Sequence, residues 1–489
     1  MLQHHETTHS SDNGAASMTS STSSMTLTEF FETTWQQSPA IFRGSQSTMP
    51  STVQQRHAAP TPSQHWSDDL MQSNPYETTI QNGWQVLTDL LEQPIMARHP
   101  QTGEPHDPPL VIHQGHVQHP QEWMPAYQST SLYAPYLNGS SIMQAHADCL
   151  SPWLAGLCQD LEKTFPYVYA NTYLTPPNSR ALNLHADDRD VFVVQLVGTK
   201  QWEVMKEVPI EFPYPHEQVG KKDEMPVPQY VVEGGTSIAT KLHAGDVLYI
   251  PRGHCHHAMC TDDLSFHVTI AVATFDWTLA GMLHMATKSV LMQDPQFRMG
   301  LLPLEGLVTT DQKNRNNDNN PHVALQAQID SAIELLHRTI TPEVVMNNLQ
   351  ARIEPHRQRA KVQRDLQLER ARMLDGSSHS SGKFAVGSLA AKHMTLRTKV
   401  RAVTAKDRAD LQELMKNQNS SETVLSHMRN DLVEDAKRVL SHLQQAETVT
   451  VAELKTLIES ENVSSVWCDL AWLGFAKRAV ELGEMATIQ

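Results

Sequence analysis

The spacing of apolar residues changes along the 489-residue chain and divides it into regions with different expected structures. From residue 27 to about residue 276, short apolar runs alternate with frequent turn signals, which is typical of a many-stranded β domain with helices at its front. From 277 to 373, apolar residues recur every three or four positions, which predicts helices. The pattern therefore predicts a mixed α+β chain.

Polar segments bound these two regions. Residues 1–26 are rich in Ser and Thr and lack the basic and apolar stretches of a secretory signal, so we expect a disordered tail. The stretch DGSSHSSGK leads to a C-terminal unit, residues 384–489. Two amphipathic helices joined by a short polar turn in this unit suit a winged-helix-like module. Its second helix carries no basic stripe, so we expect no strong direct binding to nucleic acid.

Composition narrows the choice of partners. The net charge of −16 argues against broad binding to nucleic acid phosphates, but it suits a basic protein partner. No run of residues approaches the roughly 18 apolar positions that span a bilayer, so no membrane partner is expected. The five Cys are few and irregularly spaced, which fits a reducing compartment better than a disulfide framework.

The tripeptide His-Ala-Asp occurs twice, at 146–148 and at 185–187. A chain with 26 His contains such matches by chance, so the tripeptide alone is weak evidence. The first copy precedes Ser151 and Pro152, which are a good N-cap and a good first helical residue. We therefore interpret His146 and Asp148 as residues at a helix start, with no catalytic role.

The second copy stands in a different context. His185 and Asp187 precede DVFVVQLVG and KQWEVM, which we interpret as a hairpin that turns at Gly198-Thr199. Period-2 alternation points both side chains to one face, and His256 lies on a later strand. Antiparallel strands at this spacing suggest a jelly roll whose mouth can hold a metal. Two imidazoles and one carboxylate with open positions are the arrangement of non-haem Fe(II) oxygenases.

Two longer motifs stand in order around this site, G-x-K-x-W from Gly198 and GDVLYIPRG at 245–253. With them, residues 27–280 closely resemble the JmjC oxygenases and, among these, the ribosomal-oxygenase branch. The segment FRMGLLP at 298–304 and the order of the later regions extend the resemblance more weakly. The resemblance implies a double-stranded β-helix (a jelly-roll or cupin barrel) over 27–276. It also implies a helical dimerisation region over 277–373 and a winged-helix-like domain over 384–489.

The resemblance implies an Fe(II) centre with His185, Asp187 and His256 as its ligands. GHCHHA offers three candidate histidines, and the family pattern P-R-G-x-x-H-x-A selects His256. His257 would turn to the other face, and His254 would lie in the turn.

The resemblance also implies 2-oxoglutarate as co-substrate and dioxygen as oxidant. Lys200 matches the family's carboxylate-binding lysine, while Tyr173 and Thr269 match its hydroxyl donors. A buried carboxylate needs such partners, because burying a charge without them is costly. Asn171 and Ser179 are further candidates for the substrate side.

By resemblance, the favoured reaction is hydroxylation of a histidine in a ribosomal protein. The same site could act as a histone lysine demethylase. Two other readings stay open: a metal cupin that does not use 2-oxoglutarate, and a non-catalytic scaffold or chromatin regulator. Residues 277–373 are expected to form a homodimer interface, with a monomeric helical layer as the alternative. Only the resemblance implies a location, which is the nucleus or, within it, the nucleolus.

Overall fold

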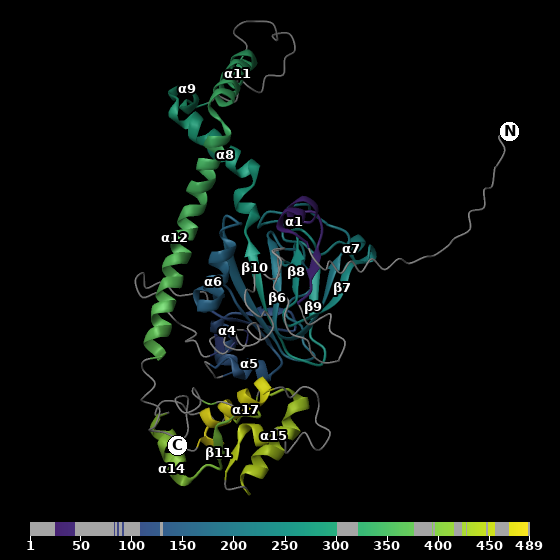
Figure 1. Cartoon of the computed structure of the whole chain (residues 1–489), viewed down its shortest axis with the longest axis vertical. Coiled ribbons are helices and arrows are strands. Elements are labelled where there is room, and N and C mark those ends of the chain that lie inside the picture. Colours follow the sequence, from purple (N-terminus) through teal and green to yellow (C-terminus); the bar gives the residue numbers. More distant parts are fainter. Residues whose placement is uncertain are drawn as a thin grey trace, which may run out of the picture.

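The computed structural model describes only part of the chain: residues 25–44, 83, 86–87, 90–91, 108–127, 131–300, 321–375, 394, 397–414, 423–426, 428–445, 448–454 and 469–487. These residues form a mixed α+β fold with an antiparallel sheet at its core and helical regions beside it, which confirms the coarse fold class (Figure 1). All but two residues of the predicted tail, and the linker at 376–383, lie outside the described residues.

The core of the fold is a ten-stranded sheet in which every pair of neighbouring strands is antiparallel. Its main path runs β1-β8-β6-β10-β5-β4-β2-β3, and both β7 and β9 pair with β6. The strands are β1 (Ala40–Phe42), β2 (Leu110–His113), β3 (His116–Gln118), β4 (Ser141–Gln144), β5 (Val168–Thr175), β6 (Asp190–Met205), β7 (Thr236–His243), β8 (Val247–Ile250), β9 (His256–Met259) and β10 (Ser265–Val272).

The two faces of the sheet have different roles, which β10 shows most clearly. Phe266, Val268 and Ile270 are buried in the main hydrophobic core. His267 and Thr269 alternate with them and line a pocket on the opposite face. Successive side chains of a strand point to opposite faces, so one strand serves both the core and the pocket.

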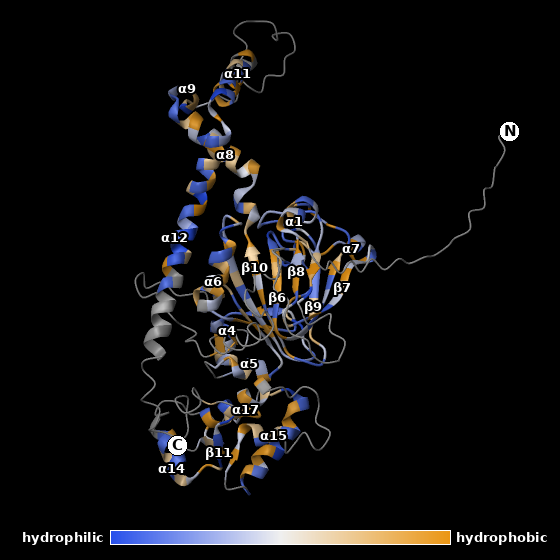
Figure 2. Ribbon diagram, in the orientation of Figure 1, coloured by the Kyte–Doolittle hydropathy of each residue, from blue (hydrophilic) through white to orange (hydrophobic). Residues whose placement is uncertain are grey.

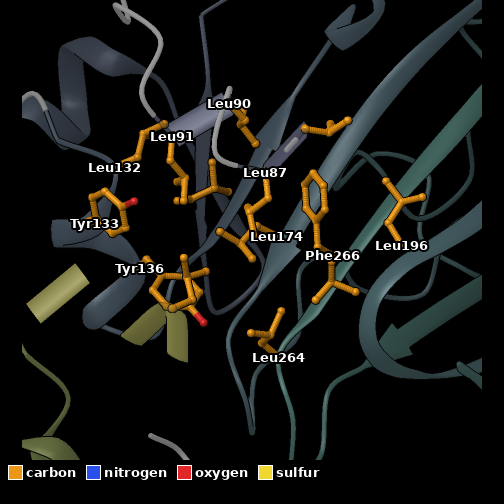
Figure 3. Packing of buried hydrophobic residues seen from close by; sticks show 14 of the residues in the cluster. Leu87, Leu90, Leu91, Leu132, Tyr133, Tyr136, Leu174, Leu196, Leu264 and Phe266 are labelled. Carbon is orange, nitrogen blue, oxygen red and sulfur yellow. The ribbon is translucent and has the colours of Figure 1, made fainter. Parts of the chain in front are cut away.

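The main core lies between the sheet and the helices that cover it. Phe266 pairs in register with Leu174 of β5. Leu87 points toward this pair, and Leu196 of β6 lies on the far side of Phe266 (Figure 3). All four side chains are fully buried. Burying a side chain of this size contributes about 1.5–3 kcal/mol, so this packing fixes β10 from behind.

Strand β6 corrects one sequence prediction: the hairpin at Gly198-Thr199 is wrong. Residues 190–205 form one continuous strand that bends at Gly198. Gly198 has φ +66, and a Cβ there would lie 1.8 Å from the Leu264 carbonyl oxygen, so only glycine fits. The register with β10 shifts beside this point. As a result, Val193 before the bend and Lys200 after it line the same pocket despite their odd and even numbers.

The helical region contains the helices that the apolar spacing predicts: α8 (Leu279–Gln293), α9 (Pro295–Arg298), α11 (Pro321–Thr339) and α12 (Pro342–Asp375). Helix α12 runs along the side of the sheet domain, and its surface is largely polar (Figure 2). Two arginines attach it there. Arg357 donates to the carbonyl of Pro166 at 2.7 Å, and Arg352 forms a 2.8 Å ion pair with Asp276.

The described part of the C-terminal unit has three strands and three main helices: β11 (Lys399–Arg401), β12 (Val449–Thr450), β13 (Ala486–Thr487), α14 (Ala405–Leu414), α15 (Asn430–Leu443) and α17 (Asp469–Glu481). Its assignment as winged-helix-like stays a prediction. Helix α17 packs against α5 (Tyr133–Leu137) of the sheet domain. Arg429 adds two hydrogen bonds across this contact, from its guanidinium to the Pro177 carbonyl at 2.6 Å and from its amide to the Leu137 carbonyl at 3.1 Å.

The remaining helices surround the sheet: α1 (Leu27–Thr33), α4 (Pro120–Ala126), α6 (Pro152–Leu161), α7 (Gln229–Glu233) and the 3₁₀ turns η1 (Ala147–Cys149) and η2 (Thr274–Trp277). None of the helices in the described ranges is both long enough and apolar enough to cross a membrane.

Candidate metal centre and adjoining pocket

A short backbone bridge brings His185 and His256 together. The amide of His185 donates to the carbonyl of His256 at 3.2 Å, and the reverse hydrogen bond is 2.8 Å long. The two imidazole rings are 4.6 Å apart. Asp187, two residues along the same extended segment, accepts a backbone hydrogen bond from Gly253. One ligand atom from each of His185, Asp187 and His256 lies within 4.8 Å of the others.

Backbone carbonyls fix the tautomer of both histidines. Nδ1 of His185 lies 2.7 Å from the Asn183 carbonyl oxygen, and Nδ1 of His256 lies 3.0 Å from that of His254. A carbonyl oxygen only accepts, so each Nδ1 carries the proton and each Nε2 keeps a free lone pair. This is the outer hydrogen bond that orients metal-binding histidines. The donor set therefore fits a divalent transition metal with open coordination positions.

The electrostatics favour the ligand forms of these residues. Burial and the neighbouring His256 lower the pKa of His185 to about 3, and burial likewise lowers the pKa of His256. Burial opposes ionisation of Asp187, but Lys221 and the two imidazoles outweigh it and hold the pKa of Asp187 below its ordinary value. At neutral pH the cluster is thus two neutral imidazoles and one carboxylate, the protonation state that metal binding requires.

Lys221 is a site residue that the sequence reading missed. Its ammonium group contacts the Asp187 carboxylate directly. The loop is held there because the Ala186 amide donates to the Val219 carbonyl at 2.9 Å. Gly220 allows the close approach, since its φ is +79 and a Cβ would lie 2.3 Å from the Leu184 carbonyl oxygen. The loop has no apolar periodicity, so no sequence pattern pointed to this lysine.

A pocket of about 470 Å³ opens beside the cluster. Its wall contains every metal-ligating and co-substrate residue that the sequence singled out: Tyr173, His185, Asp187, Lys200, His256 and Thr269. The structure brings these side chains together, while their individual roles stay predictions.

Lys200 is almost fully buried in this wall, with 2 % of its surface exposed. Its ammonium group donates to Thr175 Oγ1 at 3.0 Å and lies 5.8 Å from the centre of the Trp202 ring. No carboxylate among the described residues pairs with it. Burial lowers its pKa. A buried cation with only a hydroxyl and an aromatic face is costly, and an anionic ligand in the pocket would offset that cost.

The pocket wall next to Lys200 is aromatic. Tyr173 on β5 stacks on His267 of β10 with ring centres 5.0 Å apart and an interplanar angle of 7°. Burial and the nearby Asp187 raise the pKa of Tyr173 above its usual value, so its hydroxyl stays protonated and able to donate. His267 was not singled out from the sequence, where a lone histidine in an apolar strand looks like a core residue.

Other residues considered from the sequence lie elsewhere. The Asn171 side chain accepts from the His146 amide at 3.2 Å, and Ser179 donates to the Gly139 carbonyl at 3.1 Å; neither lines the pocket. His257 stands opposite Glu203 in register and its Nε2 lies 3.2 Å from Glu203 Oε2, so its imidazole is on the other face of β9 from His256, as predicted. His254 lies in the turn, as predicted.

Comparison with known proteins agrees with the fold and with this cluster. Residues 151–279 match the JmjC domain model. Human ribosomal oxygenase 1 is 35% identical over 138 residues, covering 27% of this chain and 20% of that protein. The bifunctional lysine-specific demethylase and histidyl-hydroxylase NO66 of Drosophila mojavensis is 29% identical over 237 residues, 44% of this chain and 26% of that protein.

Residues 151–279 are therefore a JmjC domain, and the chain is similar at moderate identity to the ribosomal oxygenases. It aligns with about a quarter of the length of the curated relatives that it matches. A solved structure of the Escherichia coli ribosomal oxygenase YcfD in complex with cobalt and 2-oxoglutarate is 15% identical, with a TM-score of 0.38, over 67% of this chain and 70% of that one.

Proposed function

We propose that this protein is an Fe(II)- and 2-oxoglutarate-dependent oxygenase that hydroxylates a histidine in a ribosomal protein. One observation carries the proposal: a His-His-Asp cluster and a buried lysine without a carboxylate partner share the wall of one pocket. The first is the donor set of non-haem iron, and the second is what a dicarboxylate co-substrate needs at its far end. The names of its relatives support the substrate.

In this proposal, iron and 2-oxoglutarate together supply an oxidant able to hydroxylate an unactivated C–H bond. The protein supplies position and environment. His185 and His256 present Nε2 because backbone carbonyls hold their Nδ1 protons. Lys200 neutralises the distal carboxylate, while Tyr173 and Thr269 offer hydroxyls beside it. The apolar surfaces of Val191 and Val193 limit water at the reacting centre.

The substrate proposed is a basic protein. The net charge of −16 raises the local concentration of a positively charged partner by electrostatic steering. Charge does not separate a ribosomal protein from a histone tail, because both are basic. Demethylation of a methylated histone lysine is thus the second candidate, supported by the demethylase in the name of the Drosophila relative. A nuclear or nucleolar location belongs to the same proposal, and a fluorescent fusion would test it.

The test is 2-oxoglutarate turnover to succinate by the full chain with Fe(II), using His-containing ribosomal-protein peptides and methylated histone tails in parallel. Mass spectrometry should show one added oxygen on a histidine peptide. The product should vanish in Asp187→Asn and persist in Asp148→Asn, the matched change in the other His-Ala-Asp copy. Loss of a methyl group with formaldehyde release would favour the demethylase instead. Absence of succinate from iron-loaded protein would overturn the proposal.

We also propose that the helical region forms a homodimer interface. Helices α8 and α11 expose large apolar side chains, among them Leu279 at 67%, Met292 at 58% and Ile333 at 58%. Such exposure is unusual on a monomeric helical layer and typical of a surface that binds a partner. Light scattering should give twice the chain mass for the wild type and a monomer for Leu279→Asp/Ile333→Asp. A monomeric wild type would leave the helices as a layer beside the sheet.

A further inference from the structure

His267 is a second buried polar group in the pocket wall, and neither the metal cluster nor the core accounts for it. Only 2 % of its surface is exposed. It lies on β10 two residues before Thr269, on the pocket face, and directly opposite Tyr173 of β5. Its neighbours Phe266 and Val268 face the main core, so the imidazole belongs to the pocket.

The hydrogen-bonding needs of this imidazole are unmet. Nδ1 of His267 is buried without a hydrogen-bond partner among the described residues. The two other buried imidazoles of the pocket, His185 and His256, each donate to a backbone carbonyl. Leaving a buried polar atom unpaired destabilises the ligand-free protein. A ligand that accepts a hydrogen bond would remove that cost.

Two aromatic rings hold the imidazole in a fixed plane. Tyr173 stacks parallel to it, and Trp202 contacts it edge to face with ring centres 5.4 Å apart. The same Trp202 ring also lies under the Lys200 ammonium group. His267 and Lys200 are thus positioned by one shared side chain, and the ring nitrogens of His267 cannot swing away to find another partner.

His267 is neutral in this setting. Burial, and then the nearby Lys200 cation, hold the pKa of His267 well below its ordinary value. A neutral imidazole keeps one N–H donor and one bare nitrogen. It can therefore donate to a carboxylate without adding a second buried charge beside Lys200.

We propose that His267 is a recognition residue for the distal carboxylate of the co-substrate, donating its N–H to the carboxylate that Lys200 neutralises. This inference rests on the proposed use of a 2-oxo acid at the metal centre and adds a specificity determinant to it. An ammonium group and an imidazole N–H side by side select a 2-oxo dicarboxylate over a 2-oxo acid with an apolar tail. The selection comes from the tail, because a methyl group leaves both donors unpaired.

The experiment compares two ligands of equal length on Mn²⁺-loaded full-length protein: 2-oxoglutarate, and 2-oxopentanoate, which has a methyl group in place of the distal carboxylate. Ligand-dependent shifts of the melting temperature give both dissociation constants, since weak ligands shift it as well. His267→Phe keeps the ring and removes the nitrogens. It should weaken 2-oxoglutarate binding by about tenfold to a hundredfold and leave 2-oxopentanoate binding unchanged.

A second variant guards against misfolding. His267→Gln retains an amide donor and should recover part of the 2-oxoglutarate affinity that His267→Phe loses. Equal losses for both ligands, or no loss for 2-oxoglutarate, would overturn the inference. Wild-type protein that binds Mn²⁺ but not 2-oxoglutarate would instead overturn the proposed function, so the two failures are distinguishable.

Discussion

The tripeptide His-Ala-Asp stands at two places in the molecule, with different surroundings. At 146–148, Asp148 is 1 % exposed and accepts a 3.0 Å hydrogen bond from the Ala170 amide. At 185–187, Asp187 lies 3.6 Å from His256 Nε2 and contacts Lys221. The first carboxylate holds two segments of the chain together. The second carboxylate is one of the three side chains of the candidate metal centre.

The backbone that follows each copy explains the difference. His146 has a left-handed φ of +48 and enters the 3₁₀ turn η1, where alternate side chains do not share a face. His185 stands in extended backbone bridged to β9, where they do. A short motif thus acquires ligand geometry only when its local structure aligns the side chains. Substitutions can test this contrast at four levels.

The largest effect is expected on metal binding. Asp187→Asn should weaken Mn²⁺ binding by at least about a hundredfold. Losing a residue that only hydrogen-bonds to a metal ligand weakens metal affinity by about tenfold to a hundredfold, and losing a charged ligand itself should weaken it more. Asp148→Asn should leave the affinity unchanged. Titration of Mn²⁺ followed by electron paramagnetic resonance measures both. Equal losses would mean that the two copies do not differ as their surroundings indicate.

The next effect extends the contrast from the cluster to its pocket. Lys200→Met should weaken 2-oxoglutarate binding by about tenfold to a hundredfold, because a charged hydrogen bond is lost. The same change should raise the melting temperature of the ligand-free protein, since an unpaired buried cation is replaced by an apolar side chain. Lys241→Met on β7, at an exposed position, is the matched control. A lower melting temperature for Lys200→Met would show that the lysine is structural.

A smaller effect is expected on stability at the first copy. Asp148→Ala leaves the buried Ala170 amide without its acceptor and should lower the free energy of unfolding by about 1–3 kcal/mol. Asp148→Asn keeps an oxygen acceptor and should lose less. Urea unfolding followed by circular dichroism compares them. Identical losses would argue that the carboxylate contributes through its charge and not through this hydrogen bond.

The smallest effect concerns Asp407, a carboxylate in the C-terminal unit whose partners are all local. It accepts two hydrogen bonds from Arg401 and caps α14 through Thr404. These partners hold its pKa below the ordinary value. A carboxyl group whose pKa is lowered by folding stabilises the folded protein at pH values above its unfolded-state pKa of about 4. This stabilisation is lost as the pH falls. The melting temperatures of wild type and Asp407→Asn should therefore differ most near pH 7 and converge below pH 4.

Sequence patterns predicted the helices from the spacing of apolar residues, and the candidate site from motifs that stand beside predicted strands. The ligand trio and Lys200 stand in motifs whose order chance rarely supplies, and the structure places them in one pocket. The predicted hairpin was wrong because Gly198 followed by Thr199 resembles a turn. Gly198 instead bends β6, so that the residues facing the pocket are odd-numbered before the bend and even-numbered after it.

Two site residues escaped prediction for physical reasons. Lys221 reaches the cluster from a loop, and loops carry no periodic signal that places a side chain in space. His267 stands where an apolar strand residue is expected, and its unmet hydrogen bonds are visible only in three dimensions. Its position two residues before Thr269 was the one available signal, since that spacing puts both on the pocket face.

The contact between the C-terminal unit and the sheet domain has a consequence for the design of shorter versions of the protein. Arg429 supplies hydrogen bonds to Pro177 and Leu137, and α17 covers the apolar face of α5. A chain cut at the linker before residue 384 would expose that face and free the segment that leads into the pocket wall at Ala181. Shortened versions for expression or crystallisation should therefore retain the last hundred or so residues.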